Sequence, residues 1–279
     1  MKLFTQLKTY LSVLLLGATL SASAATTLTF AVVPQVRPEQ VNNDWLPVLT
    51  ELNRQTGVDF KLLTYRSIPD FEAAFLKGEP DFAYLNPYHA VMAKKAAGYL
   101  PIIRDDSTPL NGILVVRKDS AIERVEQLDG ATLAFPAPNS FGASLYMRAL
   151  LLEKFKINIK PLYVSTHPNV YRNVLLGRAP AGGGVMRTLD KESPEIQAQL
   201  RVLYETPPTA SHPIAAHPRV PAKVRDAVQR AFLKMGADAT FAARLNIISV
   251  SVPVKADYSR DYAPLQELHL ERLVELDTK

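Results

Sequence analysis

Apolar positions along the chain alternate between two spacings. Short apolar runs such as residues 28–33 are typical of strands, whereas residues 39–57 carry apolar side chains every three or four positions and end in a glycine, which is typical of a helix. Further strand-like runs are residues 59–65, 81–85, 112–119, 131–135, 161–165 and 181–186, and further helix-like runs are residues 68–79, 87–98, 141–155, 169–177, 221–236 and 264–276. Strands that alternate with helices at short spacing predict an α/β fold with mostly parallel sheets.

Three of the strand-like runs pass directly into a helix start that carries proline and hydrogen-bonding side chains. We call these helix starts the first mouth (residues 84–88), the second mouth (residues 136–144) and the third mouth (residues 166–168). Asn86 and Ser140 are expected to cap the first two helices, and the second helix is expected to run through Phe155. Pro168 suits the first turn of the third helix.

The three mouths lie where strands end, which is the edge at which open α/β sheets bind ligands. Each mouth presents unpaired backbone N–H groups and about half a positive charge from the helix dipole. Neutral hydrogen-bonding side chains at such a place suit an oxyanion held in a dry site. The candidate side chains are Tyr84, Asn86, Ser140, Ser144, Thr166 and His167. Because Asn, Ser and Thr are also ordinary helix caps, the pattern alone leaves a purely structural role open.

Residues 1–24 have the pattern of a secretory signal peptide. Lys2 and Lys8 are basic, residues 11–20 form an apolar run, and small residues precede a cleavage site near Ala24. That run is shorter than the roughly 20 apolar residues that a membrane-spanning helix needs. The sequence therefore predicts export to the periplasm.

Charge and cysteine content narrow the classes of partner and chemistry. The formal charge of the 279-residue chain is +5 and falls to +3 without Lys2 and Lys8. The charges are interspersed, and no Lys- or Arg-rich block predicts binding to nucleic acid or to an anionic membrane. The chain has no cysteine, which excludes thiol catalysis and cysteine-ligated metal sites.

Motifs for catalysis are absent from the sequence. It contains no nucleotide-binding loop, serine nucleophile elbow or zinc-protease motif. His212 and His217 lie in a proline-broken segment and share no helical face for a metal ion. Gly182–Gly184 enter a strand rather than follow one, so they favour close packing or close approach to a ligand over a phosphate-cradling loop. We therefore predict no catalytic residues, no metal and no cofactor.

The order of several motifs identifies a family resemblance. The chain carries "FLKGEPDFAYLNPYHA", "GILVVRKDSAIERVEQLDGATLAFPAPNSFGAS", "VSTHPNVYRNVLLG" and "HPIAAHPRVP" in that order, behind the signal peptide. In this it resembles the PhnD-like periplasmic phosphate/phosphite/phosphonate-binding proteins of ABC transporters over nearly the whole mature chain. The resemblance implies a type II periplasmic binding protein, an α/β fold of two lobes. Each lobe would be a mostly parallel sheet flanked by helices, with the ligand cleft between the lobes.

The resemblance also implies how the chain divides between the lobes. Lobe 1 is expected to comprise residues 25–117 and 207–279, and lobe 2 is expected to comprise residues 118–206. The segments "LVVRK" and "VLYET", residues 114–118 and 202–206, would then be the two strands that cross between the lobes.

In this family a Ser/Thr-rich helix start and a histidine of the next strand–helix loop grip the ligand's oxyanion. The resemblance implies that the second and third mouths do so here, with the first mouth facing them from the other lobe. The implied ligand-binding residues are Tyr84, Asn86, Tyr88, Ser140, Phe141, Gly142, Ser144, Thr166 and His167.

Departures from the family pattern bear on the ligand. The family's aminoalkylphosphonate binders have Ser-Thr-Ser where this chain has Ser140-Phe141-Gly142, and their two acidic ammonium contacts align with Arg187 and His212. A cationic or neutral pair would not hold an ammonium group. The expected ligand is therefore a small oxyanion or one with an extra acidic group for Arg187, and both Arg187 and His212 are candidate contacts.

The resulting prediction is a monomeric periplasmic solute-binding protein that captures phosphonate, phosphite or phosphate by lobe closure. It would deliver this ligand to an inner-membrane ABC permease, and it would be neither an enzyme nor a nucleic-acid-binding protein. Two alternatives stay open at this point: a periplasmic ligand-sensing partner of a membrane sensor kinase, and an exported α/β phosphoesterase.

Overall fold

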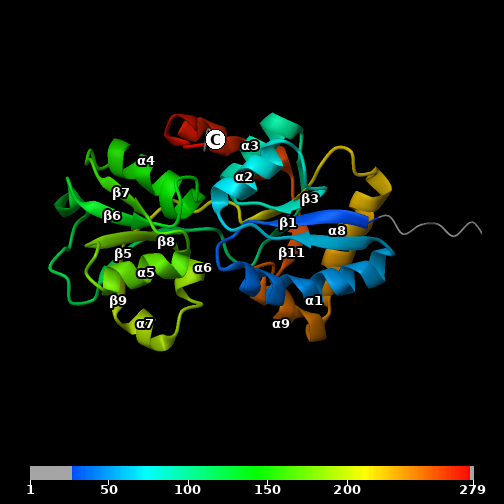
Figure 1. Ribbon diagram of the computed structural model, residues 1–279, viewed down its shortest axis with the longest axis horizontal. Helices are drawn as coiled ribbons and strands as arrows, with labels where there is room; N and C mark the ends of the chain where they lie inside the picture. Colours follow the sequence, from blue (N-terminus) through cyan, green and yellow to red (C-terminus); the bar gives the residue numbers. More distant parts are fainter. Residues whose placement is uncertain (1–26, 277–279) are drawn as a thin grey trace, which may run out of the picture.

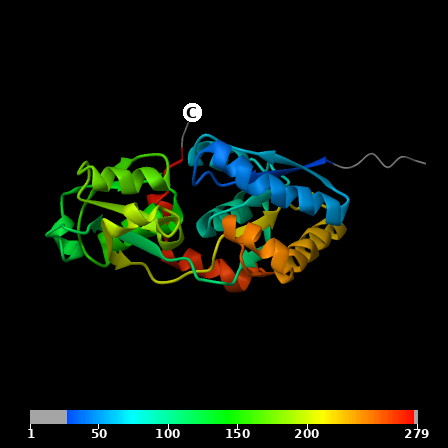
Figure 2. The same cartoon turned by 90° about the horizontal axis from the view of Figure 1, so that it is seen from below.

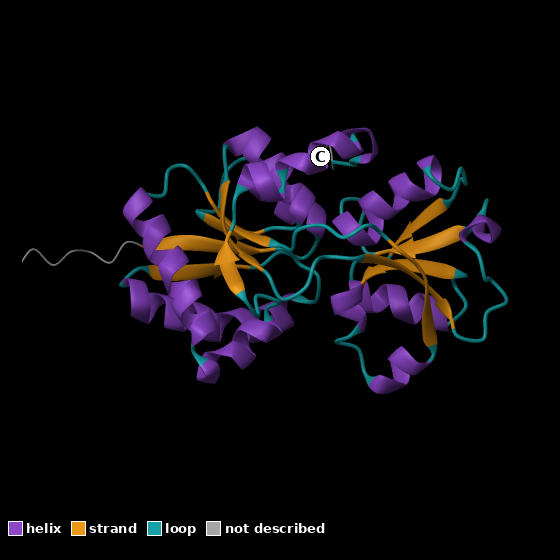
Figure 3. Ribbon diagram, turned by 180° about the vertical axis from the view of Figure 1, so that it is seen from behind, coloured by secondary structure: helices purple, strands orange, loops and turns teal. Residues whose placement is uncertain are grey.

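The alternating runs fold into two sheets, and helices cover both faces of each sheet (Figures 1 and 3). This computed structural model describes residues 27–276, so the predicted signal peptide at residues 1–24 lies outside the described residues. We call the six-stranded sheet with its helices lobe 1 and the five-stranded sheet with its helices lobe 2. None of the helices within residues 27–276 has the length and apolarity to span a bilayer.

Lobe 1 is built on a sheet with strand order β11-β4-β10-β3-β1-β2. Its strands are β1 Thr27–Val32, β2 Asp59–Leu63, β3 Phe82–Tyr84, β4 Leu100–Asp105, β10 Pro213–Ala216 and β11 Pro253–Lys255. Its helices are α1 Pro38–Thr56, α2 Ile68–Leu76, α3 Pro87–Ala97, α8 Ala222–Ala237, α9 Ala239–Ile247 and α10 Tyr258–Asp261. β2, β1 and β3 are parallel, whereas β10 runs antiparallel to both of its neighbours.

Lobe 2 is built on a sheet with strand order β7-β6-β8-β5-β9. Its strands are β5 Gly112–Arg117, β6 Thr132–Phe135, β7 Lys160–Tyr163, β8 Ala181–Val185 and β9 Leu200–Glu205. Its helices are η1 Val125–Leu128, the π-helical turn η2 Phe141–Leu145, α4 Tyr146–Glu153, α5 His167–Leu175, α6 Met186–Leu189 and α7 Pro194–Ala198. β7, β6 and β8 are parallel, and β5 runs antiparallel to β8 and β9.

The predicted α/β fold of two sheets flanked by helices is confirmed, with one refinement. The sheets are mixed rather than mostly parallel in their pairing, because one strand in the middle of each sheet is reversed. β5 and β10 are those strands, and each is the first strand after the chain has crossed from the other lobe.

The predicted crossing strands are wrong. Residues 112–117 form β5, whose side chains are buried up to the last residue, and residues 200–205 form the edge strand β9 beside it. A run of buried β-branched residues fits a central strand rather than an exposed connection. The chain crosses instead at residues 106–111 and 206–212, where Leu110 and Thr209 form an isolated antiparallel bridge. Residues 112–117 therefore belong to lobe 2, not to lobe 1.

The end of the chain differs from the predicted single helix over residues 264–276. It forms two short 3₁₀ helices, η3 Ala263–Leu268 and η4 Leu270–Leu273, separated by His269 in a left-handed conformation (φ 46°). We call residues 263–276 the C-terminal segment. Figures 1 and 2 show it, in red, passing from lobe 1 across to lobe 2.

The glycines of β8 serve packing. A Cβ on Gly183 would clash with the carbonyl oxygen of Ala143, and a Cβ on Gly112 would clash with that of Gly142. The main chain of the π-helical turn therefore rests directly on β5 and β8 with no side chain between them.

Candidate functional site

The three mouths meet at one small void between the lobes. Each mouth follows the carboxyl end of a strand: β3 leads to α3, β6 to the π-helical turn, and β7 to α5. The void has a volume of about 10 Å³ and is lined by Asn86 of the first mouth, Ser140, Phe141 and Gly142 of the second, and His167 of the third. Such a volume suffices for about one water molecule.

In the first mouth, Asn86 works as the predicted cap. Its Oδ1 accepts a hydrogen bond from the His89 N–H (2.7 Å), and its Nδ2 donates to the carbonyl oxygen of Asn139 across the cleft (3.0 Å). Both ends of this side chain are thus occupied by protein. Asn86 shapes the void while its amide is already bonded.

The two tyrosines of the first mouth have different surroundings. The ring of Tyr84 lies between Trp45 (4.9 Å between centroids) and His212 (5.4 Å), and burial raises its pKa. Tyr88 stacks on Phe141 (6.3 Å) and donates to Glu271 Oε2 (3.4 Å). Tyr84 therefore forms a wall of the cleft, whereas Tyr88 packs one lobe against the other outside it.

In the second mouth, the prediction that Ser140 caps a helix is wrong. Its side chain makes no cap bond, because its Oγ lies 3.3 Å from Nε2 of His167. The carbonyl oxygen of Ser140 accepts from the N–H groups of both Ser144 (2.7 Å) and Leu145 (3.1 Å), which widens the turn into a π-helix. The α-helix that follows ends at Glu153 rather than Phe155.

Ser144 does not line the void. It is buried, and its hydroxyl accepts a hydrogen bond from Nε of Arg148 (3.3 Å). Thr166 of the third mouth is likewise outside the void, because its hydroxyl caps α5 by accepting from the Asn169 N–H (3.4 Å). A hydroxyl that serves its own helix is not free for a ligand.

His167 is fixed by hydrogen bonds at both ring nitrogens. Its Nδ1 lies 3.4 Å from the hydroxyl of Thr188, which donates its own proton to the carbonyl oxygen of Val185 (2.8 Å). Nδ1 therefore carries the proton, and Nε2 accepts from Ser140. Burial lowers the pKa of His167 to about 4, so the ring is neutral at pH 7.

His212 lies beside the void on the lobe 1 side. Its ring stacks on Tyr84, and its Nε2 lies 3.4 Å from the side-chain nitrogen of Gln35. Burial, followed by the positive charge of Arg187, lowers the pKa of His212 to about 3. Both histidines at the void are thus neutral, and the void is walled by neutral polar groups.

The void opens into a larger cavity of about 310 Å³. The two share Gln35, Leu110, Val185 and His212, and the cavity also brings together charges of both signs. Its charged lining residues are Arg187, Asp190, Lys191 and Glu205.

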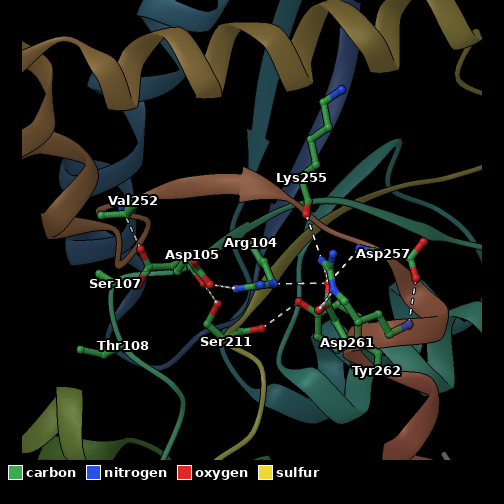
Figure 4. Close-up of polar contacts among 12 residues, drawn as sticks. Arg104, Asp105, Ser107, Thr108, Ser211, Val252, Lys255, Asp257, Asp261 and Tyr262 are labelled. Carbon is green, nitrogen blue, oxygen red and sulfur yellow. Dashed lines mark hydrogen bonds and ion pairs between the residues drawn. The ribbon is translucent and has the colours of Figure 1, made fainter.

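Arg187 lines this cavity, but lobe 1 occupies its guanidinium. Nη2 donates to Asp105 Oδ2 (2.6 Å) and Thr108 Oγ1 (2.5 Å), and Nη1 donates to the carbonyl oxygen of Ser249 (2.8 Å). Figure 4 shows Asp105 from the other side, where Ser107 and the Val252 N–H also donate to its carboxylate. Burial alone would raise the pKa of Asp105, yet these donors hold it below its usual value.

Sequence reasoning missed Gln35. This residue lines both the void and the cavity, and its carbonyl oxygen accepts from the His167 N–H (3.4 Å). It follows β1, whose carboxyl end lies at the same edge of the sheet as that of β3. The rule that found the mouths would have found Gln35 if applied to strand ends without a helix directly behind them.

No group of three or more His, Cys, Asp and Glu side chains suited to a metal ion occurs within residues 27–276. The polar groups at the void are hydroxyl, amide and imidazole groups together with the N–H groups that open a helical turn. Such a set can hold an anion by hydrogen bonds.

Comparison with known proteins agrees with this geometry. The sequence model of a family described as "ABC transporter, phosphonate, periplasmic substrate-binding protein" matches residues 30–262. No curated protein matches the chain.

Solved structures share the fold at low identity. A binding-protein component of an ABC phosphonate transporter from Pseudomonas aeruginosa superimposes with a TM-score of 0.80 at 17% identity, covering 90% of this chain and 88% of that chain. PhnD1 from Prochlorococcus marinus in complex with methylphosphonate gives 0.77 at 16% identity, covering 87% and 97%. A Xanthomonas citri protein bound to ATP gives 0.71 at 17% identity, covering 89% and 98%.

Proposed function

The chain belongs to the family of periplasmic phosphonate-binding proteins of ABC transporters, and we propose that it captures a phosphate-like oxyanion by closing its two lobes. Members of this family bind substrates in the periplasm and are not enzymes, so the predictions of a binding protein and of a periplasmic location agree with it. The ligand we propose is a phosphonate, phosphite or phosphate, handed on to an inner-membrane permease.

The observation that carries the proposal is the convergence of the three mouths on one void. Ser140 and His167 of lobe 2 and Asn86 of lobe 1 line it together. The N–H groups of Phe141 and Gly142 open the helical turn there, where backbone donors have no partner within the helix. An anion among these groups would touch both lobes.

The size of the void bears on the mechanism. A volume of about 10 Å³ is too small for a phosphonate group, so the lobes have to part before a ligand enters. A ligand that then bridges both lobes stabilises the closed arrangement over the open one. Its binding free energy shifts the population between the two.

A proton rearrangement accompanies binding. In the ligand-free arrangement Ser140 lies against Nε2 of His167, which accepts a proton and so would repel an anion. The hydroxyl of Ser140 has to turn toward the ligand, and His167 can then take up a proton, because a nearby negative charge raises the pKa of an imidazole.

The ligand we propose is small. The guanidinium of Arg187, a candidate for a second acidic group, already bonds Asp105, Thr108 and Ser249. Methylphosphonate, which PhnD1 from Prochlorococcus marinus binds, is therefore the first probe to try.

The test is thermal unfolding of the mature protein with phosphate, phosphite, methylphosphonate, aminoethylphosphonate and sulfate. A ligand at 100 times its Kd adds about 2.7 kcal/mol of stability. For a chain of this size that corresponds to roughly 5–10 °C in Tm. If no probe raises the Tm, the proposal fails.

Paired variants locate the site. Ser140→Ala combined with His167→Ala is expected to abolish the ligand-induced rise in Tm. Ser144→Ala is the matched control, because it removes a buried hydroxyl of the same turn that does not line the void. A full ligand response in the double variant would place the site elsewhere.

The two alternatives left open by the sequence gain no support. Nothing in residues 27–276 or in the family match favours sensing for a membrane kinase or hydrolysis of phosphoesters over transport.

A further inference from the structure

Asn139, the residue before Ser140, belongs to lobe 2 but bonds to other parts of the molecule. Its side chain is buried, with 1% of the residue exposed. Its Nδ2 donates to Glu72 Oε2 in α2 of lobe 1 (2.9 Å), and its main-chain oxygen accepts from Nδ2 of Asn86 (3.0 Å). Its amide thereby reaches across the cleft.

Glu72 is a buried carboxylate that depends on this bond. The residue is 2% exposed, and its other oxygen lies 2.8 Å from Nε2 of the buried His89. A carboxylate removed from water needs hydrogen-bond donors, and an unmet one destabilises the structure. Glu72 has one donor from lobe 1 and one from lobe 2, so parting the lobes removes half of its partners.

The C-terminal segment is fixed to the same amide. Asn139 donates to the carbonyl oxygen of Glu275 (2.7 Å) and accepts from the Glu275 N–H (3.0 Å). The carboxylate of Glu275 also accepts from Arg148 (3.1 Å) and Tyr163 (2.7 Å) of lobe 2. A segment that leaves lobe 1 is thus held on lobe 2 beside the cleft (Figure 2).

We propose that Asn139 is a positioning residue that couples lobe closure to the placement of the anion-gripping turn. Its amide completes the bonding of Glu72 and docks the C-terminal segment only when the lobes are together. The peptide that holds these bonds leads directly into Ser140, so closure and the position of Ser140 are set by one residue. The effect on ligand affinity rests on the proposed function, whereas the effect on lobe closure does not.

The interlobe distance tests this without ligand. The chain has no cysteine, so Leu46→Cys in α1 and Leu176→Cys at the end of α5 give one label site on each lobe. Both side chains are exposed in the native protein. Between spin labels at these sites, Asn139→Ala is expected to broaden the distance distribution and shift it to longer values. Asn173→Ala is the matched control, because that exposed amide bonds only within α5, to the carbonyl oxygen of Asn169.

A reciprocal exchange separates coupling from simple loss of stability. Asn139→Asp sets two carboxylates against each other and is expected to open the lobes. Adding Glu72→Gln restores one donor and one acceptor between the two positions, while the new amide at position 72 can still accept from His89. The double variant should recover most of the wild-type distance distribution. Losses that add up in the double variant would overturn the proposal.

Ligand binding supplies a second readout. Asn139→Ala is expected to weaken methylphosphonate binding by about tenfold to hundredfold, as loss of a hydrogen bond to a buried charge implies. The Glu72→Gln/Asn139→Asp pair should regain most of this loss. If the wild type binds none of methylphosphonate, phosphite and phosphate, the proposed function fails, while the label distances still decide the role of Asn139. An unchanged distance in Asn139→Ala overturns that role even if the ligand binds.

Discussion

The two sides of the cleft hold the lobes together in different ways. On the hinge side, beside crossing residues 106–111, Arg187 and Lys191 of lobe 2 donate to Asp105, Ser249 and Ile247 of lobe 1. We call this set the hinge-side clasp. On the other side, the tail-side clasp consists of Asn139 with Glu72, Asn86 and Glu275. One clasp uses partly exposed cations, and the other uses a buried neutral amide.

Both clasps place a buried carboxylate on lobe 1 and its donor on lobe 2, yet the carboxylates differ in what they keep when the lobes part. Asp105 retains Ser107 and the Val252 N–H, which belong to its own lobe. Glu72 retains only His89. The number of donors within the same lobe therefore decides how strongly each carboxylate favours closure, and Glu72 favours it more.

The largest effect is expected from Asp105→Ala, which tests the support that Asp105 gives to lobe 1 itself. The change leaves the Val252 N–H and the guanidinium of Arg187 without their acceptor. The free energy of unfolding should fall by about 3–5 kcal/mol, as when a buried ion pair loses one partner. Urea unfolding measures this, with Asp106→Ala, at an exposed neighbour, as the control. A loss below about 1 kcal/mol would contradict the bonding described for Asp105.

Acid should destabilise the region that both clasps enclose. The pKa of His167 is lowered to about 4, against 6.5 when exposed, so the unfolded chain binds more protons between these values. Stability therefore falls as the pH falls through this window, by about 1.5 kcal/mol between pH 6.5 and 5 for His167 alone.

The His167→Asn variant checks this assignment. Urea unfolding at a series of pH values should show a shallower decline in the variant than in the wild type. Equal slopes in the two proteins would mean that His167 is hydrated in solution, and the closed cleft would then be a minor arrangement.

Salt should separate the two clasps. The side chain of Arg187 is 29% exposed, so its interaction with Asp105 is partly screened by ions. Arg187→Ala is expected to lower the unfolding free energy by about 1 kcal/mol in 0.1 M NaCl and by less in 1 M NaCl. The loss caused by Asn139→Ala should not change with salt, because its partner is buried and the amide is uncharged. The same salt response in both variants would erase the distinction.

The smallest effect is expected from Lys191→Ala. The ammonium of this exposed lysine donates to the Ile247 carbonyl oxygen (2.8 Å) and to Ser249 Oγ (3.0 Å), and neither acceptor is charged. The unfolding free energy should change by no more than about 0.5 kcal/mol. A larger loss would show that the hinge-side clasp depends on Lys191 as well as on Arg187.

The sequence predicts what depends on neighbours along the chain. Proline and a hydrogen-bonding residue before an apolar run specify a helix start, and the caps at Asn86 and Thr166 form as this pattern predicts. The convergence of strand ends also follows from the order of strands and helices. These features need only short-range information together with the general geometry of parallel strands.

The bonds across the cleft are not predictable in this way. Asn139 meets Glu72 and Glu275, which are 67 and 136 residues away along the chain, and no local pattern marks them as partners. The role of Ser140 was mistaken for a related reason. Its hydroxyl had two possible partners, its own helix and His167, and only the folded lobe decides between them.

The seating of the π-helical turn on glycines has a consequence for engineering. Because the main chain at Gly142 and Ala143 already touches the strands beneath it, even one added methyl group at Gly112 or Gly183 would displace the floor of the site. Attempts to give the protein a bulkier cargo should leave that floor untouched. They should recarve the walls instead, where Asn111, Met186 and Glu205 come from separate pieces of chain and can be exchanged one at a time.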